Sequence, residues 1–211
     1  HPAVLEGVLM RNGFKVFDAD AHVIYPADLW PRYLDKKFID RVERRPPPGF
    51  DHYSPTVIDG RYTQHPTSIY GNFQKAVHWT TEDMVAQYGE MVTAGFTGDR
   101  VATALKVEGV DAMVIYGPEY DPWVEGIDPE MQASMARAYN RWLADFCAEV
   151  PGRRAGVAEI LLYDVDDAVA EVRAIREAGL TGGIVPPADG DEDGLVPLYY
   201  NEYEPPWAVC E

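Results

Sequence analysis

Hydrophobic and polar residues follow one another along the chain in blocks, and the period of each block predicts an element of secondary structure. A strand is predicted at 15–23, where apolar residues are followed by polar residues at every second position. Short apolar segments predict three further strands, at 111–117, 154–162 and 181–188. The segments between the last three strands have the longer period of helices, so the pattern is a repeated strand–helix unit.

The best-defined helix is predicted at 128–150, where apolar residues recur every three or four positions and form a stripe that faces the core. Asp128 is a preferred N-cap residue, and Pro129 suits the first helical position. Further helices are predicted at 26–42 (short and broken), 97–110, 164–179 and 203–211. In the helix at 97–110, the residues expected to face inward are Val101, Leu105 and Val107.

The alternation of strands and helices is typical of a parallel sheet with helical crossovers, so the predicted fold class is α/β. A doubly wound sheet and a (β/α) barrel both fit this order. No G-x-G-x-x-G segment or P-loop follows a predicted strand, so the main signals of a nucleotide-binding sheet are missing. A complete barrel has eight strands and typically about 250 residues. A barrel built from the strands predicted here would therefore be incomplete.

Residues 44–98 interrupt the alternation and are rich in proline, glycine and aromatic residues. Inside this stretch, Asp59-Gly60 lies between strand-like residues, which is the signal of a type I′ hairpin. We expect a long excursion with its own hairpin inside a single domain of residues 1–211. The excursion is either a lid that contributes Arg61 to a substrate pocket, or a solvated hairpin or subunit contact.

Composition narrows the class of protein further. The 211 residues are 46% hydrophobic, which is enough for a packed core, and the formal net charge is −17. Such an acidic chain is not expected to bind nucleic acid or an anionic membrane. The two cysteines, Cys147 and Cys210, have no C-x-x-C or disulfide-framework spacing, which predicts a reducing, cytoplasmic location. No apolar stretch reaches the roughly 20 residues of a transmembrane helix.

One short segment, FDADAHVIYP at 17–26, carries the residues of greatest chemical interest. Asp18, Asp20 and His22 occupy every second position, and side chains two residues apart in a strand point to one face. Asp20 and His22 can therefore reach one divalent cation at about 2.0–2.2 Å, while Asp18 could support His22 or a neighbouring ligand from one pleat deeper. Alternatively, these residues belong to an ordinary turn at the end of the strand, in which the aspartates cap the following segment.

The next predicted strand, 111–117, has polar residues at its C-terminal end as well. Tyr116 ends it and Glu119 follows shortly afterwards. Functional residues of a parallel barrel lie at the C-terminal ends of its strands. Both residues are therefore expected to line a substrate pocket, although a structural role fits them equally.

Four blocks of the sequence carry a further signal through their order. They are FDADAHVIYPADLWPRYLD (17–35), LKVEGVDAMVIYGPEY (105–120), ARAYNRWLADFCAEVPGRRAGVAEILLYDVDDAVAEVRAIREAGLTGGIVPP (136–187) and PLYYNEYEPPWAVCE (197–211). In this order they resemble the amidohydrolase-related family of metal-dependent barrels. The resemblance is to the branch that includes aminocarboxymuconate-semialdehyde decarboxylase and γ-resorcylate decarboxylase.

The resemblance implies a TIM-like (β/α)8 barrel that is incomplete here, with the first four β/α units and a long excursion after the first strand. It implies one divalent metal ion, with zinc expected and manganese or another ion also suitable. The family's first strand ends in His-x-His, or in a variant with an acid first, so Asp20 and His22 take two metal-ligand positions. The family's other ligands lie on later strands that this sequence does not contain. We therefore expect an N-terminal fragment that is inactive by itself.

The activity that the resemblance implies is non-oxidative decarboxylation of a small carboxylated aromatic or unsaturated substrate, by an enzyme expected to be a homodimer. One alternative is a hydrolase that cleaves a C–N, C–O or C–C bond through a metal-activated water. Another alternative is a non-catalytic, truncated or degenerate α/β protein. Release of carbon dioxide from candidate aromatic acids separates the first activity from the other two.

Overall fold

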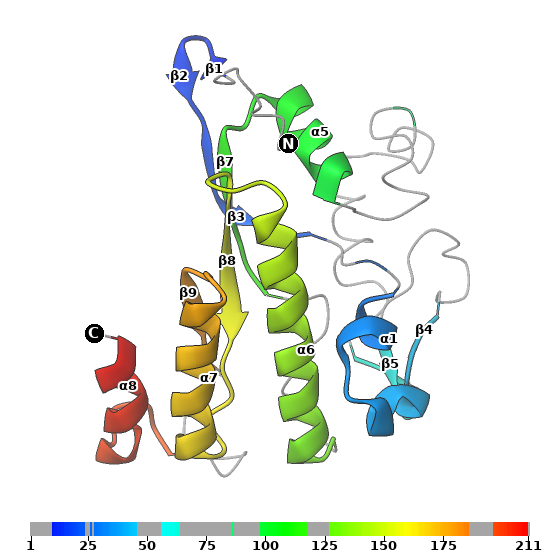
Figure 1. Ribbon diagram of the computed structural model, residues 1–211, viewed down its shortest axis with the longest axis vertical. Coiled ribbons are helices and arrows are strands. Elements are labelled where there is room, and N and C mark those ends of the chain that lie inside the picture. The colour runs from blue at the N-terminus through cyan, green and yellow to red at the C-terminus, as the bar shows by residue number, and fades with distance from the viewer. Residues whose placement is uncertain are drawn as a thin grey trace.

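The computed structural model describes residues 10–23, 26, 28–45, 56–63, 86, 98–117, 127–185 and 196–210. At its centre, four parallel strands form one sheet in the order β3-β7-β8-β9 (Figure 1). The strands are β3 (Phe17–Ala21), β7 (Ala112–Ile115), β8 (Arg154–Glu159) and β9 (Gly182–Ile184). The predicted α/β class is confirmed, and each strand lies within its predicted range.

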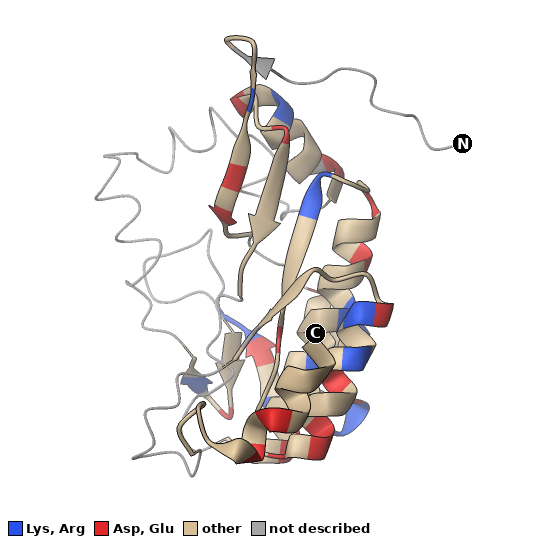
Figure 2. Cartoon of the chain, turned by 90° about the vertical axis from the view of Figure 1, so that its left-hand side faces the viewer, with Lys and Arg blue, Asp and Glu red and all other residues tan. Residues whose placement is uncertain are grey.

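Helices connect these strands. They are α5 (Gly98–Glu108) before β7, α6 (Pro129–Ala148) before β8, α7 (Val165–Glu177) before β9, and α8 (Glu204–Cys210) after it. The strands stand in sequence order, and right-handed crossovers between them place successive helices on one side of the sheet. Figure 2 shows α6 and α7 on the same face. This arrangement is the outer layer of a barrel and not a doubly wound sheet. None of the described helices combines the length and the apolar character that a membrane span requires.

The long helix α6 forms as predicted, because its first turn and its apolar stripe are both specified locally. The carboxylate of Asp128 accepts a hydrogen bond from the backbone N–H of Met131 at 2.9 Å, and Pro129 opens the helix. The stripe residues are all buried: Met131, Met135, Tyr139, Trp142 and Phe146. Burial of one such side chain contributes about 2 kcal/mol, so the stripe is the main source of helix stability.

The other crossover helices, α5 and α7, agree with the sequence predictions except at one residue. In α7, Asp164 accepts a hydrogen bond from the Asp167 N–H at 2.9 Å, as a predicted N-cap does. In α5, Val101 and Leu105 are buried as predicted, but Val107 is 67% exposed. The prediction for Val107 is wrong, because two residues turn a helix by about 200° and move the side chain away from the side of Leu105.

A small hairpin precedes the main sheet. It consists of β1 (Met10–Arg11) and β2 (Phe14–Lys15), which pair antiparallel. Asn12 and Gly13 join them with φ angles of +56° and +84°. Asn-Gly is the preferred dipeptide for such a turn, so the sequence contains the signal for this hairpin. The hairpin is not among the elements predicted above.

Residues at the start of the predicted excursion, together with the two residues just before it, form a small antiparallel sheet. Its strands are β4 (Val42–Arg44), β5 (Thr56–Ile58) and β6 (Arg61–Tyr62). The predicted hairpin is confirmed, because Asp59 and Gly60 join β5 to β6 with φ angles of +49° and +81°. Most of 44–98 lies outside the described residues. The division of the chain into a single domain with this excursion stays a prediction.

The segment predicted as a short, broken helix at 26–42 links this small sheet to α6. It is observed as α1 (Leu29–Tyr33) and the 3-10 helix η1 (Lys36–Arg41). Trp30 is buried, and its indole N–H donates to the Thr56 hydroxyl at 3.1 Å. The Tyr33 hydroxyl donates to Asp145 of α6 at 2.7 Å. Partial burial and this hydrogen bond raise the pKa of Tyr33 to about 12, so its phenol stays protonated.

Arg41, at the end of η1, makes a second connection between the small sheet and α6. Its guanidinium donates to both carboxylate oxygens of Asp59, at 3.0 and 2.8 Å, and to Asp128 at 2.7 Å. Hydrogen bonds from Arg41 are the main reason that the pKa values of Asp59 and Asp128 lie below the ordinary aspartate value. The three side chains are partly exposed, so solvent screening limits what they contribute to stability.

Replacing Arg41 with glutamine is expected to lower the free energy of unfolding by about 1 kcal/mol near neutral pH. Both carboxylates have pKa values that are lower in the folded state than in the unfolded state. Their contribution is therefore present above the unfolded pKa, about 4, and is lost as the pH falls through the folded one. The difference between wild type and variant should shrink between pH 7 and pH 3 in urea unfolding. A constant difference would contradict this explanation, and Lys36→Gln, an exposed change in the same element, is the control.

At the N-terminal edge of the main sheet, side chains hold the beginnings of three strands together. Asp111 accepts a hydrogen bond from the Val16 N–H at 2.8 Å, and Arg153 donates to the Asp111 carbonyl at 2.6 Å. Arg154 is buried, donates to the Phe146 carbonyl at 2.7 Å, and lies 4.0 Å from the centre of that ring. The two arginines therefore have structural roles at the start of β8.

Candidate functional site

Strand β3 ends in a bulge that brings Asp20 and His22 together. Between Asp18 and Ala21, β3 advances by three residues while β7 advances by two. One extra residue of this kind is a β-bulge, which bends a strand and redirects its side chains, often beside active sites. His22 Nε2 lies 3.4 Å from Asp20 Oδ1, and the two side chains are 69% and 81% exposed. The two predicted ligands therefore lie side by side and face solvent.

The separation of these two atoms suits a shared divalent cation. Two atoms bound at about 2.1 Å in a tetrahedral site lie roughly 3.4 Å apart. A carboxylate oxygen and an imidazole nitrogen are both common ligands of such ions. Within the described residues, no group of three or more histidine, cysteine, aspartate and glutamate side chains could hold a metal. The described part of the chain thus offers a pair of donors that fits a metal, without a third.

Asp18 acts on this segment through the backbone. Its carboxylate accepts a hydrogen bond from the Asp20 N–H at 3.1 Å. This contact lies within the stretch where the register of β3 shifts relative to β7. Support of His22 by the Asp18 side chain itself stays a prediction.

The other predicted pocket residues are spread over the molecule. Tyr116 follows β7, and its N–H donates to the Ala21 carbonyl at 3.0 Å, which places its backbone beside the end of β3. Arg61 is exposed and belongs to β6 of the small sheet. Glu119 lies outside the described residues. The structure brings Tyr116 close to the chain segment of Asp20 and His22, and a pocket role for each of these three residues stays a prediction.

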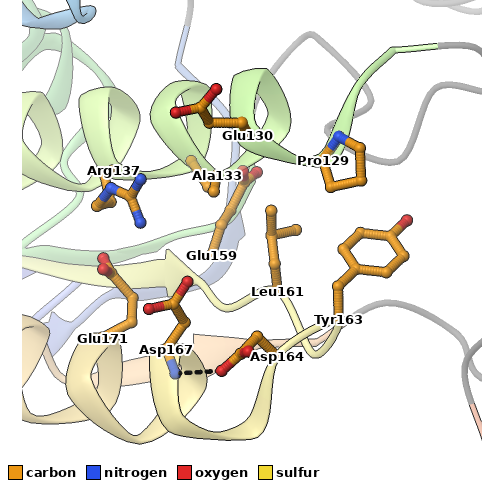
Figure 3. Close-up of a pocket in the computed structure, with 11 residues that line it drawn as sticks. Pro129, Glu130, Ala133, Arg137, Glu159, Leu161, Tyr163, Asp164, Asp167 and Glu171 are labelled. Carbon is orange, nitrogen blue, oxygen red and sulfur yellow. Dashed lines mark hydrogen bonds between the residues drawn. The ribbon is translucent and has the colours of Figure 1, made fainter.

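A cavity of about 400 Å³ lies between the first turns of α6 and α7, beside the C-terminal end of β8 (Figure 3). Because parallel strands end at one edge of a sheet, the cavity and His22 lie at the same edge. Its lining includes Glu130 and Arg137 from α6, Glu159 and Leu161 at the end of β8, and Asp167 and Glu171 from α7. No local pattern in the sequence predicts this cavity, because its wall combines residues from three elements.

Asn140 fixes the end of β8 beside this cavity. Its Oδ1 accepts from the Glu159 N–H, and its Nδ2 donates to the Glu159 carbonyl and to Glu171, all at 2.8 Å. Strand β7 pairs with β8 only as far as Gly156. Beyond that point the buried amide of Asn140 takes the place of the neighbouring strand's backbone. The only signal in the sequence is a polar residue within the apolar stripe of α6.

Cys147 lies in surroundings that disfavour its reactive form. Burial raises the pKa of its thiol to about 11, although the Arg154 charge acts in the opposite direction. At neutral pH such a thiol is almost entirely protonated, and the thiolate is the reactive form. This agrees with the sequence, which places no base beside Cys147.

The chain is similar in sequence to characterised decarboxylases. Over 111 residues it is 32% identical to γ-resorcylate decarboxylase from Rhizobium sp. (strain MTP-10005), a match that covers 51% of this chain and 33% of that protein. Over 100 residues it is 37% identical to γ-resorcylate decarboxylase from Rhodococcus jostii (strain RHA1), covering 43% and 30%. The match thus spans about a third of these relatives. No family model matches the chain.

Solved structures extend the likeness to most of the fold. An amidohydrolase from Mycobacterium avium subsp. paratuberculosis K-10 aligns with a TM-score of 0.60 at 20% identity, covering 92% of this chain and 55% of that one. 5-Carboxyvanillate decarboxylase from Novosphingobium aromaticivorans aligns with a TM-score of 0.55 at 16% identity, covering 94% and 48%. The parallel α/β sheet therefore has the fold of part of these barrels. The resemblance to γ-resorcylate decarboxylases is confirmed by the sequence match over about half of this chain.

Proposed function

We propose that this protein is a metal-dependent decarboxylase that releases carbon dioxide from a small carboxylated aromatic substrate without oxidation. The observation that carries the proposal is the Asp20–His22 pair at the end of β3, in a chain that shares sequence with γ-resorcylate decarboxylases. Because the match covers about a third of those enzymes, the proposed activity is that of the whole protein and not of the described residues alone.

Asp20 and His22 would hold the metal. A divalent ion in such a site supplies a Lewis acid for a carboxylate or carbonyl oxygen, or lowers the pKa of water. The 5-carboxyvanillate decarboxylase of known structure was crystallised with manganese, so Mn²⁺ is the first ion to test beside the zinc expected from the sequence. A carboxylate and an imidazole suit both ions.

The residues of the chain set the conditions for binding. Asp20 brings a negative charge that attracts the cation, and His22 must be unprotonated to bind it, so metal binding is expected to weaken in acid. Asp18 accepts a hydrogen bond from the backbone N–H of Asp20, next to the proposed ligand carboxylate. The pair is exposed, which leaves it open to an approaching substrate.

A hydrolase remains the second candidate, and the same exposure favours it. Asp20 and His22 are open to water in the structure, and a metal held by such a pair serves hydrolysis of a C–N, C–O or C–C bond as well. A decarboxylase and a hydrolase built on this pair differ in their products. The two proposals are therefore separated by product analysis.

The test is a product assay on the protein in its full natural length, loaded with Mn²⁺ or with Zn²⁺. The substrates are 2,6-dihydroxybenzoate, 5-carboxyvanillate and matched esters and lactones. We expect carbon dioxide in equal amount with the decarboxylated phenol. Hydrolysis of an ester or lactone with no release of carbon dioxide would overturn the decarboxylase proposal. A homodimer in the cytoplasm is the assembly and location that we propose with it, and sedimentation of the same sample tests the dimer.

A further inference from the structure

The cavity between α6 and α7 has the size and the walls of a small-molecule site. Its volume of about 400 Å³ falls within the range of roughly 300–1,000 Å³ that is usual for ligand pockets. Leu161 and Ala133 form apolar parts of its wall, and the Tyr163 ring, 37% exposed, stands at one end (Figure 3). A molecule with a small apolar body therefore fits between the two helices.

Arg137 is the one cationic residue among those that line this cavity. In Figure 3 its guanidinium reaches from α6 toward the carboxylates of Glu171 and Asp167 on α7, without a hydrogen bond to any residue drawn. Its side chain has no hydrogen bond or ion pair with another residue in the part of the chain that the structure describes. A half-buried guanidinium keeps its hydrogen-bond donors available, and their planar fork matches a carboxylate.

The carboxylates around Arg137 decide what else the ligand must carry. Five carboxylates line the cavity, and three are already engaged: Glu130 with Lys37, Glu171 with Asn140, and Asp164 with the backbone N–H of Asp167. A fourth, Glu159, is fully buried at the end of β8. The Asp167 carboxylate has no partner among the described residues. An ionised carboxylate only accepts hydrogen bonds and repels a purely anionic molecule. The ligand must therefore bring a hydrogen-bond donor as well as an acid.

We propose that this cavity is a second ligand site, separate from the Asp20–His22 pair, for a small organic acid that also carries a hydrogen-bond donor. The acid group binds Arg137, the donor binds Asp167, and the apolar body lies against Leu161. The site is built on α6, α7 and the end of β8. Asp20 and His22 lie at the end of β3, and two strand spacings, about 10 Å, separate β3 from β8. Binding here needs neither the metal nor turnover.

The test uses 2,6-dihydroxybenzoate as the probe, with benzoate as the analogue that lacks the donors, on the full-length protein kept free of metal by a chelator. Calorimetric titration should show one probe per chain. Arg137→Gln should weaken binding of both compounds at least 10-fold, because it removes the charged fork. Asp167→Asn should weaken only the dihydroxy compound. Arg173→Gln, an exposed arginine of α7 outside the cavity, should leave both affinities unchanged.

Two results would overturn the proposal. One is the absence of binding at millimolar probe. The other is binding that disappears in His22→Ala and is unaffected by Arg137→Gln, which would assign the probe to the metal pair. Thermal unfolding confirms that each variant is folded, and Arg137→Lys provides a second variant that keeps the charge and loses the fork. Because the measurement involves no turnover, its result is independent of whether the decarboxylase proposal succeeds.

Discussion

Replacing His22 with alanine is expected to remove the bound metal and to lower the rate of decarboxylation by at least about 100-fold. Loss of a residue that only supports a metal ligand costs about 10–100-fold, so loss of a ligand should cost no less. The His22 side chain is 69% exposed, so the change should leave the free energy of unfolding within about 0.5 kcal/mol of wild type. Elemental mass spectrometry after desalting, together with a carbon dioxide assay on the full-length protein, measures both effects.

The comparison with Asp18 makes this experiment specific. Asp18→Asn leaves Asp20 and His22 in place and changes only the group that accepts the Asp20 N–H. Metal should be retained, with a smaller loss of rate, on the order of 10-fold. Equal metal content in wild type and His22→Ala would rule out His22 as a ligand. The Asp20–His22 contact would then be an exposed ion pair of little energetic consequence.

Replacing Asn140 with alanine is expected to destabilise the fold by about 3 kcal/mol. The change removes three hydrogen bonds of 2.8 Å and leaves the buried N–H and carbonyl of Glu159 without this partner. Each orphaned buried group costs about 1–3 kcal/mol, so the sum exceeds the effect of a typical surface change. For a chain of this size the midpoint of thermal unfolding should fall by about 6–12 °C.

Urea unfolding of the Asn140 variants measures the effect and tests its cause. Asn140→Asp keeps the acceptor for the Glu159 N–H but loses the donor, and it places a second negative charge beside Glu171. Asn201→Ala, a change at an exposed asparagine, is the matched control and should stay within about 0.5 kcal/mol of wild type. A loss below 1 kcal/mol in Asn140→Ala would mean that water or a shifted backbone replaces the amide.

The elements that depend on nearby residues could be predicted from the sequence. Asp128 and Asp164 cap helices through N–H groups three residues away, and Asp59-Gly60 makes its turn from two positive φ angles. The proximity of Asp20 and His22 belongs to the same class, because the two residues are only two positions apart. The error at Val107 has the same local origin, since its helical phase was misjudged by a fraction of a turn.

Other features were decided only by the tertiary structure, because their partners are distant in the chain. Asn140 holds a strand 19 residues away, and Arg41 reaches Asp128 across 87 residues. The bulge in β3 exists only relative to β7, and the cavity beside Arg137 exists only because α6 and α7 pack side by side. Local periodicity specified which segments became strands and helices. Long-range packing determined which polar groups met, because a buried polar side chain is paired by whatever the fold brings within reach.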